Sequence, residues 1–245
     1  MQHEILNYGG GTQTAAMCVL VAEGMLPRPD AIIAADTGRE MPTTWEYLNN
    51  VMRPYLAMHG LEVHVADHSF AAVDIYAHNG DLLLPVYTGP TGRLSTFCST
   101  EWKHRVVWRY ARKHLNFTGD LIHWIGFSLD EKRRVKTQEF RRYPLIDLML
   151  TKSECVSLIE RAGLPLPSKS RCWMCPHQNN AEWREVRSHP ELWQQALELE
   201  REINENDEYG NMFLHVSRTP LHEAQLDEES TREPTRQCGL GLCFV

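Results

Sequence analysis

Short apolar segments alternate with helically periodic segments at the start of the chain, and this alternation constrains the fold more than any other feature. Residues 4–8 and 31–35 are typical of buried strands, and residues 61–65 alternate in polarity like a third strand. Residues 14–23 and 42–58, which lie between these strands, have helical periodicity. Strands that alternate with helices predict a parallel sheet covered by helices on both faces, which is the α/β class.

The pattern resumes after a stretch that contains several Gly and Pro residues. We expect a helix over residues 101–114, a fourth strand over residues 121–125 and a further helix over residues 151–162. A charged segment over residues 182–206 also has a helical period. The order of these elements predicts a helical C-terminal region that follows the α/β region.

The length and composition suit one folded domain with appendages. The chain has 245 residues, of which 42% are hydrophobic and 23% are charged. We predict a nucleotide-binding α/β domain over residues 1–150. A helical cap and tail that carry four cysteines are predicted over residues 151–245, and the two parts are expected to form one integrated unit.

The charge and the start of the chain limit the classes of partner. A formal net charge of -7 argues against a broad, sequence-independent grip on nucleic acid, which needs clustered cations. Basic stretches at residues 105–113 and 132–136 leave a local contact open, although solvated helix faces explain them more simply. Residues 1–4 do not begin a secretory leader, and no apolar run approaches the ~18 residues of a membrane helix. We therefore expect a cytoplasmic protein that does not contact membranes.

Three consecutive glycines, Gly9, Gly10 and Gly11, follow the first strand and open the first helix. Glycine allows positive φ and lets backbone N–H groups approach an anion, and a helix N-terminus favours phosphate or sulfate. The hydroxyl groups of Thr12 and Thr14 can add donors. The segment lacks the Lys of a P-loop and the spacing of a dinucleotide-binding motif. A plain tight turn is the alternative interpretation.

Asp36 and the two residues after it stand at the carboxyl end of the second predicted strand. Ligands of open α/β sheets bind outside the carboxyl ends of the strands. An Asp at this place can accept hydrogen bonds from a ribose or an adenine amino group, or help to hold Mg²⁺. A helix N-cap is the alternative, since Asp and Thr cap well.

These motifs, with later ones in the same order, resemble the phosphoadenosine phosphosulfate (PAPS) reductase family of the adenine nucleotide alpha-hydrolase-like, or PP-loop, superfamily. The similarity is greatest to PAPS-reductase-like proteins common in phages and bacterial mobile elements, which would place the protein in a host cytoplasm. It covers nearly the whole chain through the segments at residues 8–14, 36–48, 98–103, 125–131, 143–146, 170–176, 182–183, 214–215, 220–221 and 238–245.

The resemblance implies a Rossmann-like sheet that binds an adenine nucleotide, either ATP or PAPS/APS. The glycine turn would take the phosphate or sulfate end, and the segment at Asp36 would lie near the nucleoside. The nucleotide-binding residues that it implies are Gly9, Gly10, Gly11, Thr12, Gln13, Thr14, Asp36, Thr37, Gly38, Lys103, Gly126 and Asp130.

Cys172 and Cys175 form a Cys-x-x-Cys motif, and seven cysteines in a cytoplasmic chain favour metal binding or catalysis over disulfides. The two-residue spacer lets both thiolates reach one metal, but a closed zinc site or a [4Fe-4S] cluster needs two further ligands. The spacing does not separate the two metals, whereas the resemblance favours iron–sulfur. It also implies Cys98 as the third ligand and Cys243 as the fourth. Cys238 and His177 remain alternatives for the fourth ligand.

Two departures from the family bear on its chemistry. Cluster-bearing sulfonucleotide reductases carry adjacent cysteines where this chain has Phe97 and Cys98, so one ligand must come from the tail or the metal is not a cluster. The reductase tail has Glu before its catalytic Cys and a His after it, whereas Cys238 lies between Gln237 and Gly239 with Leu240 next. Cys238 is the candidate catalytic nucleophile, and it would need nearby cations to lower its pKa.

The leading hypothesis is a PAPS-reductase-like enzyme with an iron–sulfur cluster that acts in sulfur metabolism or sulfur transfer. One alternative is an ATP pyrophosphatase that modifies nucleic acid by thiolation or phosphorothioation. Another is a zinc-stabilised nucleotide-binding module without catalysis. The expected partners are a small nucleotide and either a nucleic acid substrate or a protein that donates sulfur or electrons. The sequence leaves the oligomeric state open.

Overall fold

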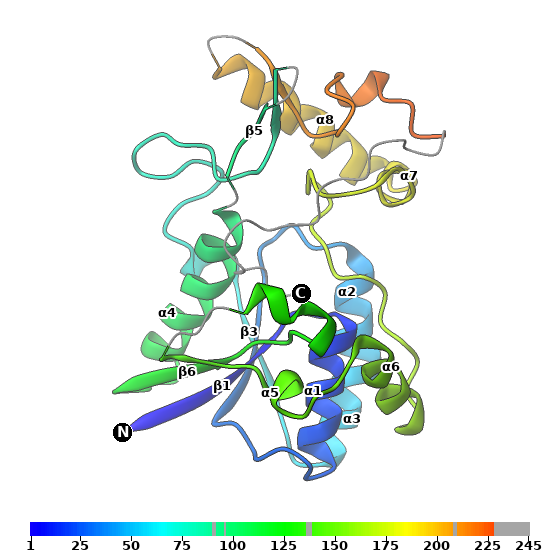
Figure 1. Ribbon diagram of the computed structural model, residues 1–245. Coiled ribbons are helices and arrows are strands. Elements are labelled where there is room, and N and C mark those ends of the chain that lie inside the picture. The colour runs from blue at the N-terminus through cyan, green and yellow to red at the C-terminus, as the bar shows by residue number, and fades with distance from the viewer. Residues whose placement is uncertain (90–91, 96, 136–138, 208–209, 228–245) are drawn as a thin grey trace. The chain divides into compact units, whose positions relative to one another are not determined.

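The computed structural model describes residues 1–89, 92–95, 97–135, 139–207 and 210–227. Its main feature is a five-stranded sheet in the order β3-β2-β1-β6-β7, in which every neighbouring pair is parallel (Figure 1). The predicted α/β, Rossmann-like class is therefore confirmed. The strands are β1 (Gln2–Tyr8), β2 (Ala31–Ala35), β3 (Val63–Ala66), β6 (Asp120–Trp124) and β7 (Arg141–Arg142).

Helices cover both faces of this sheet. Successive side chains of a strand point to opposite faces, so neighbouring residues of β1 pack in different cores. Leu6 and Tyr8 of β1 pack in one core with several helical segments, whereas Ile5 packs in a second core against α4 (Arg105–Lys113). The helices of the first face include α1 (Thr12–Ala22), α3 (Arg53–Met58) and α6 (Lys152–Arg161). Burial on both faces explains the unbroken apolar run of β2 and the apolar centres of β1 and β6.

The helix α1 lies at the centre of the first face, where it contacts α3, α6 and the short helix α5 (Pro144–Asp147). Every residue from position 13 to position 21 is buried. A helix that is buried on all sides lies inside a core, so α1 is fixed against the sheet. Its packing also fixes the position of the three glycines that precede it.

Two helical segments differ in detail from their sequence patterns. Residues 42–58 form one continuous helical run, made of α2 (Pro42–Tyr47), a π-helical turn (Leu48–Met52) and α3. Residues 182–206 form two helices, α7 (Asn180–Arg187) and α8 (Pro190–Glu205), and not one. Pro190 explains the break, because proline cannot continue a helix from the preceding turn but fits the first turn of the next.

The chain divides into two compact units whose segments alternate along the sequence. The first holds Met1–Ala72 and Ser99–Arg171, and it contains the five-stranded sheet. The second holds Val73–Cys98 and the described part of Cys172–Leu240. It contains α7, α8 and an antiparallel sheet of β5 (Gly92–Arg93), β4 (Tyr87–Thr88) and β8 (Met212–Phe213). The division at residue 150 stays a prediction.

No helix in the described ranges is long and apolar enough to cross a bilayer.

Candidate functional site

The order of the strands places a topological switch point between β1 and β6. The chain runs from β1 outward to β2 and β3 on one side, whereas β6 and β7 lie on the other side. The loops that leave β1 and β6 therefore separate at the carboxyl edge of the sheet. Ligands of open α/β sheets bind at such a point, so this edge of the sheet is the expected position of a ligand site.

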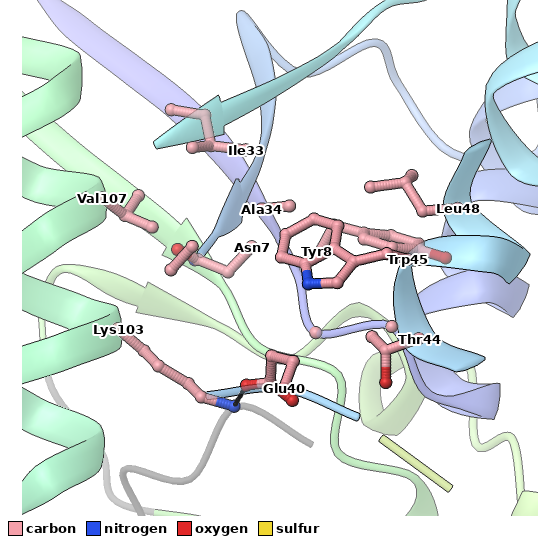
Figure 2. Close-up of a pocket in the computed structure, with 13 residues that line it drawn as sticks. Asn7, Tyr8, Ile33, Ala34, Glu40, Thr44, Trp45, Leu48, Lys103 and Val107 are labelled. Atoms are coloured by element: carbon pink, nitrogen blue, oxygen red, sulfur yellow. Dashed lines mark ion pairs between the residues drawn. The ribbon is translucent and has the colours of Figure 1, made fainter. Parts of the chain in front are cut away.

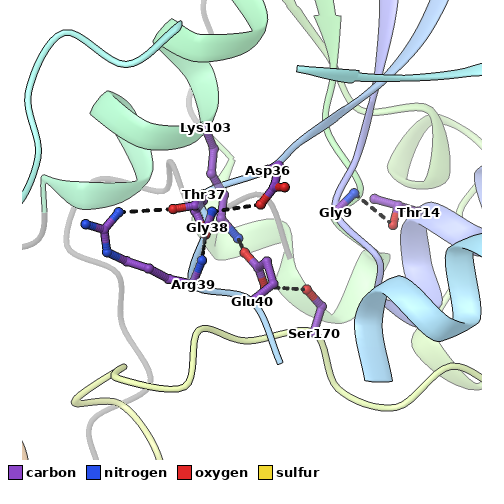
Figure 3. Close-up of polar contacts among 9 residues, drawn as sticks. All are labelled: Gly9, Thr14, Asp36, Thr37, Gly38, Arg39, Glu40, Lys103 and Ser170. Carbon is purple, nitrogen blue, oxygen red and sulfur yellow. Dashed lines mark hydrogen bonds and ion pairs between the residues drawn. The ribbon is translucent and has the colours of Figure 1, made fainter. Parts of the chain in front are cut away.

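The glycine turn after β1 is held in a conformation that requires glycine. Gly10 has a φ of 77°, and a Cβ there would lie 2.5 Å from Cγ2 of Thr44. The backbone N–H of Gly9 donates to the Thr14 hydroxyl at 3.3 Å, and this hydroxyl donates to the Gly11 carbonyl at 3.1 Å (Figure 3). Thr14 therefore braces the turn from within the first turn of α1.

The N-terminus of α1 has the features of an anion site. Its N-cap is Gly11, which offers no side chain to the first backbone N–H groups, and its first turn has no acidic residue. Gly126, at the end of β6, packs so closely that a Cβ would lie 2.6 Å from Cγ2 of Thr14. The two loops thus meet around the start of this helix, whose dipole favours negative charge.

A pocket opens beside the glycine turn, between the carboxyl ends of β1 and β2 (Figure 2). The space that it encloses is partly open to solvent. Two aromatic side chains and several aliphatic ones border it, with few polar groups. The lining residues are Asn7, Tyr8, Gly9, Gly10, Ile33, Ala34, Ala35, Glu40, Thr44, Trp45, Leu48, Lys103 and Val107.

Lys103 and Glu40 form an ion pair at this pocket. The Lys103 Nζ lies 2.8 Å from Oε1 of Glu40, and the two side chains are 18% and 4% exposed. The Ser170 hydroxyl donates to the other carboxylate oxygen of Glu40 at 3.4 Å (Figure 3). The pair therefore places a cation at the pocket and balances its charge while no anion is bound.

The segment at Asp36 is organised mainly by its own hydrogen bonds. Oδ1 of Asp36 accepts from the backbone N–H of Gly38 at 2.7 Å, and Gly38 has a φ of 66°. The hydroxyl of Thr37, which is fully buried, accepts from the backbone N–H of Arg39 at 3.2 Å. The guanidinium of Arg39 stacks on the ring of Trp102, 4.6 Å from its centroid. Asp36 follows β2 as expected but does not line the pocket.

The remaining predicted nucleotide residues take structural contacts in the described part of the chain. Asp130 accepts from the backbone N–H of Lys152 at 2.5 Å and from the Ser128 hydroxyl at 3.4 Å, so it stabilises the start of α6. The Gln13 amide donates to Glu131 at 3.0 Å. Of the predicted set, Gly9, Gly10 and Lys103 line the pocket, and Asp130 lies at the start of α6. The others surround the start of α1 or follow β2.

Cys172 and Cys175 lie in a tight turn of the second unit. The backbone N–H of Cys175 donates to the carbonyl of Cys172 at 3.1 Å, and that of Gln178 donates to the carbonyl of Cys175 at 3.2 Å. Cys98 belongs to the same unit, and all three thiols are partly exposed. Among the described residues, no group of three or more His, Cys, Asp or Glu side chains is arranged to hold a metal. Cys238 and Cys243 lie outside the described residues.

Two further cysteines have a packing role. Burial alone raises the pKa of the Cys18 thiol well above its ordinary value. Burial, with nearby carboxylates, raises the pKa of Cys155 to about 12. Both thiols therefore stay protonated and take part in the core between α1 and α6.

The sequence interpretation missed Asn7, Tyr8, Glu40 and Trp45 as pocket residues. Asn7 carried a usable signal, since it is a polar residue at the end of an otherwise apolar strand. No local pattern distinguishes Glu40 or Trp45 from ordinary residues of a loop and a helix. Their side chains reach the pocket only because the loop after β2 and the helix α2 both border it in the folded chain.

No protein-family model matches this chain, and a search of curated proteins finds no match either.

Proposed function

We propose that this chain is a cytoplasmic enzyme that binds an adenine nucleotide at the carboxyl edge of the main sheet and uses it in sulfur metabolism or sulfur transfer. The glycine turn carries the proposal. Gly10 is confined there by Thr44, and the uncapped start of α1 lies next to a pocket that contains a lysine. Backbone N–H groups at a helix N-terminus are typical ligands of phosphate.

The pocket suits the nucleoside part of such a ligand. The rings of Tyr8 and Trp45 border a mainly apolar space, and aromatic rings provide large apolar contact for a planar base. Lys103 is a cation that lines the pocket and can contact the phosphates, and its ion pair with Glu40 holds its side chain there until they bind. Asp36 remains the candidate for contacting the ribose or for helping to hold Mg²⁺.

The cysteines of the second unit are the proposed metal ligands. The observation that supports this part of the proposal is the pair of thiols in one tight turn, which matches half of the four-thiolate set of a [4Fe-4S] cluster or, as the alternative, of zinc, and a third thiol belongs to the same unit. We propose Cys98, Cys172 and Cys175 as ligands together with Cys243 of the tail. When bound, a cluster would supply redox or electrostatic chemistry, and zinc would supply stability.

Two reactions fit this frame, and they differ in what Cys238 does. In the reductive route, the Cys238 thiolate attacks the sulfur of PAPS or APS and the nucleotide leaves. A thiol of a dithiol donor then attacks the cysteine sulfur, so that sulfite leaves and a mixed disulfide forms, and the donor's second thiol releases Cys238 and is left as a disulfide. In the second route, an acceptor oxygen attacks the α-phosphorus of ATP and pyrophosphate leaves. The absence of the reductase Glu and His around Cys238 favours the second route, for which the acceptor would be a nucleic acid or another substrate awaiting sulfur.

Binding and turnover experiments test the proposal. We expect isothermal titration to show binding of ATP, PAPS or APS by the anaerobically purified protein, and no binding would contradict the proposal. Sulfite release that is lost in Cys238→Ser would assign the reductive route. Pyrophosphate release from ATP that survives this substitution would assign the second route.

A further inference from the structure

Asn7 is the one amide side chain of the pocket, and it is almost completely buried. It lies near the carboxyl end of β1, it is 2% exposed, and it lines the pocket between β1 and β2. In Figure 2 it lies among Ile33, Val107 and Tyr8. A buried polar group that borders a ligand cavity is placed to decide which ligand fits, because an unmatched partner leaves it without hydrogen bonds.

The orientation of this amide is fixed by two neighbours from β6. The Asn7 Nδ2 donates to the backbone carbonyl of Trp124 at 3.1 Å, and Oδ1 lies 3.2 Å from Nδ1 of His123. Since a carbonyl oxygen can only accept, the amide nitrogen must face Trp124 and the amide oxygen must face His123. His123 must then carry its hydrogen on Nδ1 and donate it to Asn7.

The state of His123 supports this arrangement. Its side chain is buried, and burial, followed by the charges of His104 and Arg141, lowers its pKa to about 3. The ring of His104 lies 4.7 Å from the His123 ring, and the His123 Nε2 is buried without a hydrogen-bond partner in the described residues. A neutral imidazole with its hydrogen on Nδ1 is thus the stable form at neutral pH.

The fixed amide keeps one acceptor for a ligand. Both hydrogens of Nδ2 are used, since it donates to the Trp124 carbonyl and, at 3.5 Å, to the Ile5 carbonyl, whereas Oδ1 has a second lone pair. The 6-amino group of adenine offers the complement, because it donates. The O6 of hypoxanthine is an acceptor instead. Turning the amide to match it would set oxygen against the Trp124 carbonyl and N–H against the His123 N–H.

We propose that Asn7 is the specificity-determining residue that selects a 6-aminopurine over a 6-oxopurine, and that His123 is the positioning residue that holds its amide. The inference rests on the proposed function, since it takes the pocket ligand to be a nucleotide. It goes beyond that function by naming the group that distinguishes one purine from another. His123 acts through Asn7 and does not touch the ligand.

The test compares affinities for ATP and inosine triphosphate, with tripolyphosphate as a probe that has no base. We expect the wild type to prefer ATP by about 5- to 150-fold, the range that corresponds to about 1–3 kcal/mol for a buried polar group left without a matching partner. In Asn7→Leu this ratio should fall to about one, while the tripolyphosphate affinity stays as in the wild type. That retained affinity shows that the glycine turn is still folded.

The positioning role is tested with two variants at one site. His123→Leu removes the donor, and we expect the ATP preference to fall several-fold. His123→Asn places an amide N–H near the position of Nδ1, so it should restore most of the preference. If His123 had a purely structural role, His123→Leu would lower the affinities for ATP and for inosine triphosphate equally and leave their ratio unchanged.

The outcomes separate the two proposals. If the wild type binds tripolyphosphate and nucleotides but its ratio for ATP over inosine triphosphate is near one, or if Asn7→Leu keeps the ratio, the inference is wrong while the proposed function stands. If the wild type binds neither nucleotide nor tripolyphosphate, the proposed function fails and the inference fails with it.

Discussion

Gly10 and Thr44 approach so closely that a Cβ on Gly10 would lie 2.5 Å from Cγ2 of the threonine. This contact joins the turn after β1 to the helix α2 after β2, and so it couples two loops at the carboxyl edge of the sheet. Gly10 also has a φ of 77°, a conformation that residues with a Cβ rarely adopt. The position therefore excludes larger residues both by its conformation and by its space.

Gly10→Ala should abolish binding of nucleotide and of tripolyphosphate, because the added methyl group must displace Thr44 or the turn itself. Gly24→Ala is the matched control, since Gly24 has a φ of 75° but nothing within 4 Å of its Cβ position. Both substitutions introduce the left-handed strain of about 1–2 kcal/mol, and only the first adds a clash. Calorimetric titration with thermal unfolding measures both effects. Equal binding by the two variants would show that the turn is not the anion site.

The ion pair between Lys103 and Glu40 predicts a stability effect and a binding effect. Lys103→Met removes the cation that lies 2.8 Å from the buried Glu40 carboxylate, and we expect a loss of about 3 kcal/mol in the free energy of unfolding, with weaker nucleotide binding. The double variant Glu40→Gln with Lys103→Met should recover much of the stability but not the binding. Urea unfolding and nucleotide titration measure the two effects.

An exposed pair serves as the control for this comparison. Arg201 and Glu205 lie 3.7 Å apart with side chains 71% and 70% exposed, so Arg201→Met should change stability by less than about 1 kcal/mol. A loss in Lys103→Met no larger than this would mean that the pocket pair is screened by solvent and does not hold the lysine.

Buried histidines predict a loss of stability in mild acid. Burial is the main cause that lowers the pKa of His104 to about 4 and that of His123 to about 3, with Arg141 contributing to both. The unfolded chain takes up protons near pH 6.5 while the folded chain does not. The stability is therefore complete above pH 6.5 and is lost as pH falls from there toward 3, at about 1.4 kcal/mol for each unit of pKa difference.

Urea unfolding between pH 7.5 and about pH 4 measures this loss, and the variants assign it. His123→Asn cannot titrate, so its free energy of unfolding should fall less steeply with pH than that of the wild type. His222→Gln is the control, because it also replaces a histidine but at a side chain that is 64% exposed. An identical pH dependence in wild type and His123→Asn would contradict the buried, neutral state of this histidine.

Four strands of the main sheet could be predicted from the sequence because of their apolar or alternating patterns, whereas β7, which consists of Arg141 and Arg142, carries no such pattern. Residues 31–35 are an unbroken apolar run, and β2 occupies the same positions in the structure. The small sheet could not be predicted, since β4, β5 and β8 have two residues each and carry no period. Its strands are paired by contacts between distant segments, as when Tyr87 pairs with Phe213.

The candidate site was likewise predictable only where it depends on residues that are close together in the sequence. The glycine turn was predictable because it depends on a local conformation, which three glycines in succession reveal. Asn7, Glu40 and Trp45 were not identified, since they reach one pocket from different parts of the chain. The role of Asn7 depends on His123, which is 116 positions away, and no spacing rule covers such a pair.

The turn that carries Cys172 and Cys175 predicts a metal-dependent property of the protein. We expect anaerobically purified wild type to be brown, with iron matched by acid-labile sulfide, and we expect Cys172→Ser to lose both. Cys155→Ala is the control, because Cys155 is a buried packing thiol and its replacement should leave the metal in place. The optical spectrum and analysis for iron, sulfide and zinc measure the outcome.

A colourless protein with stoichiometric zinc that is lost in Cys172→Ser would contradict the cluster and favour a zinc-stabilised turn. Equal metal content in wild type and Cys172→Ser would mean that this turn holds no metal, and its thiols would then require another explanation.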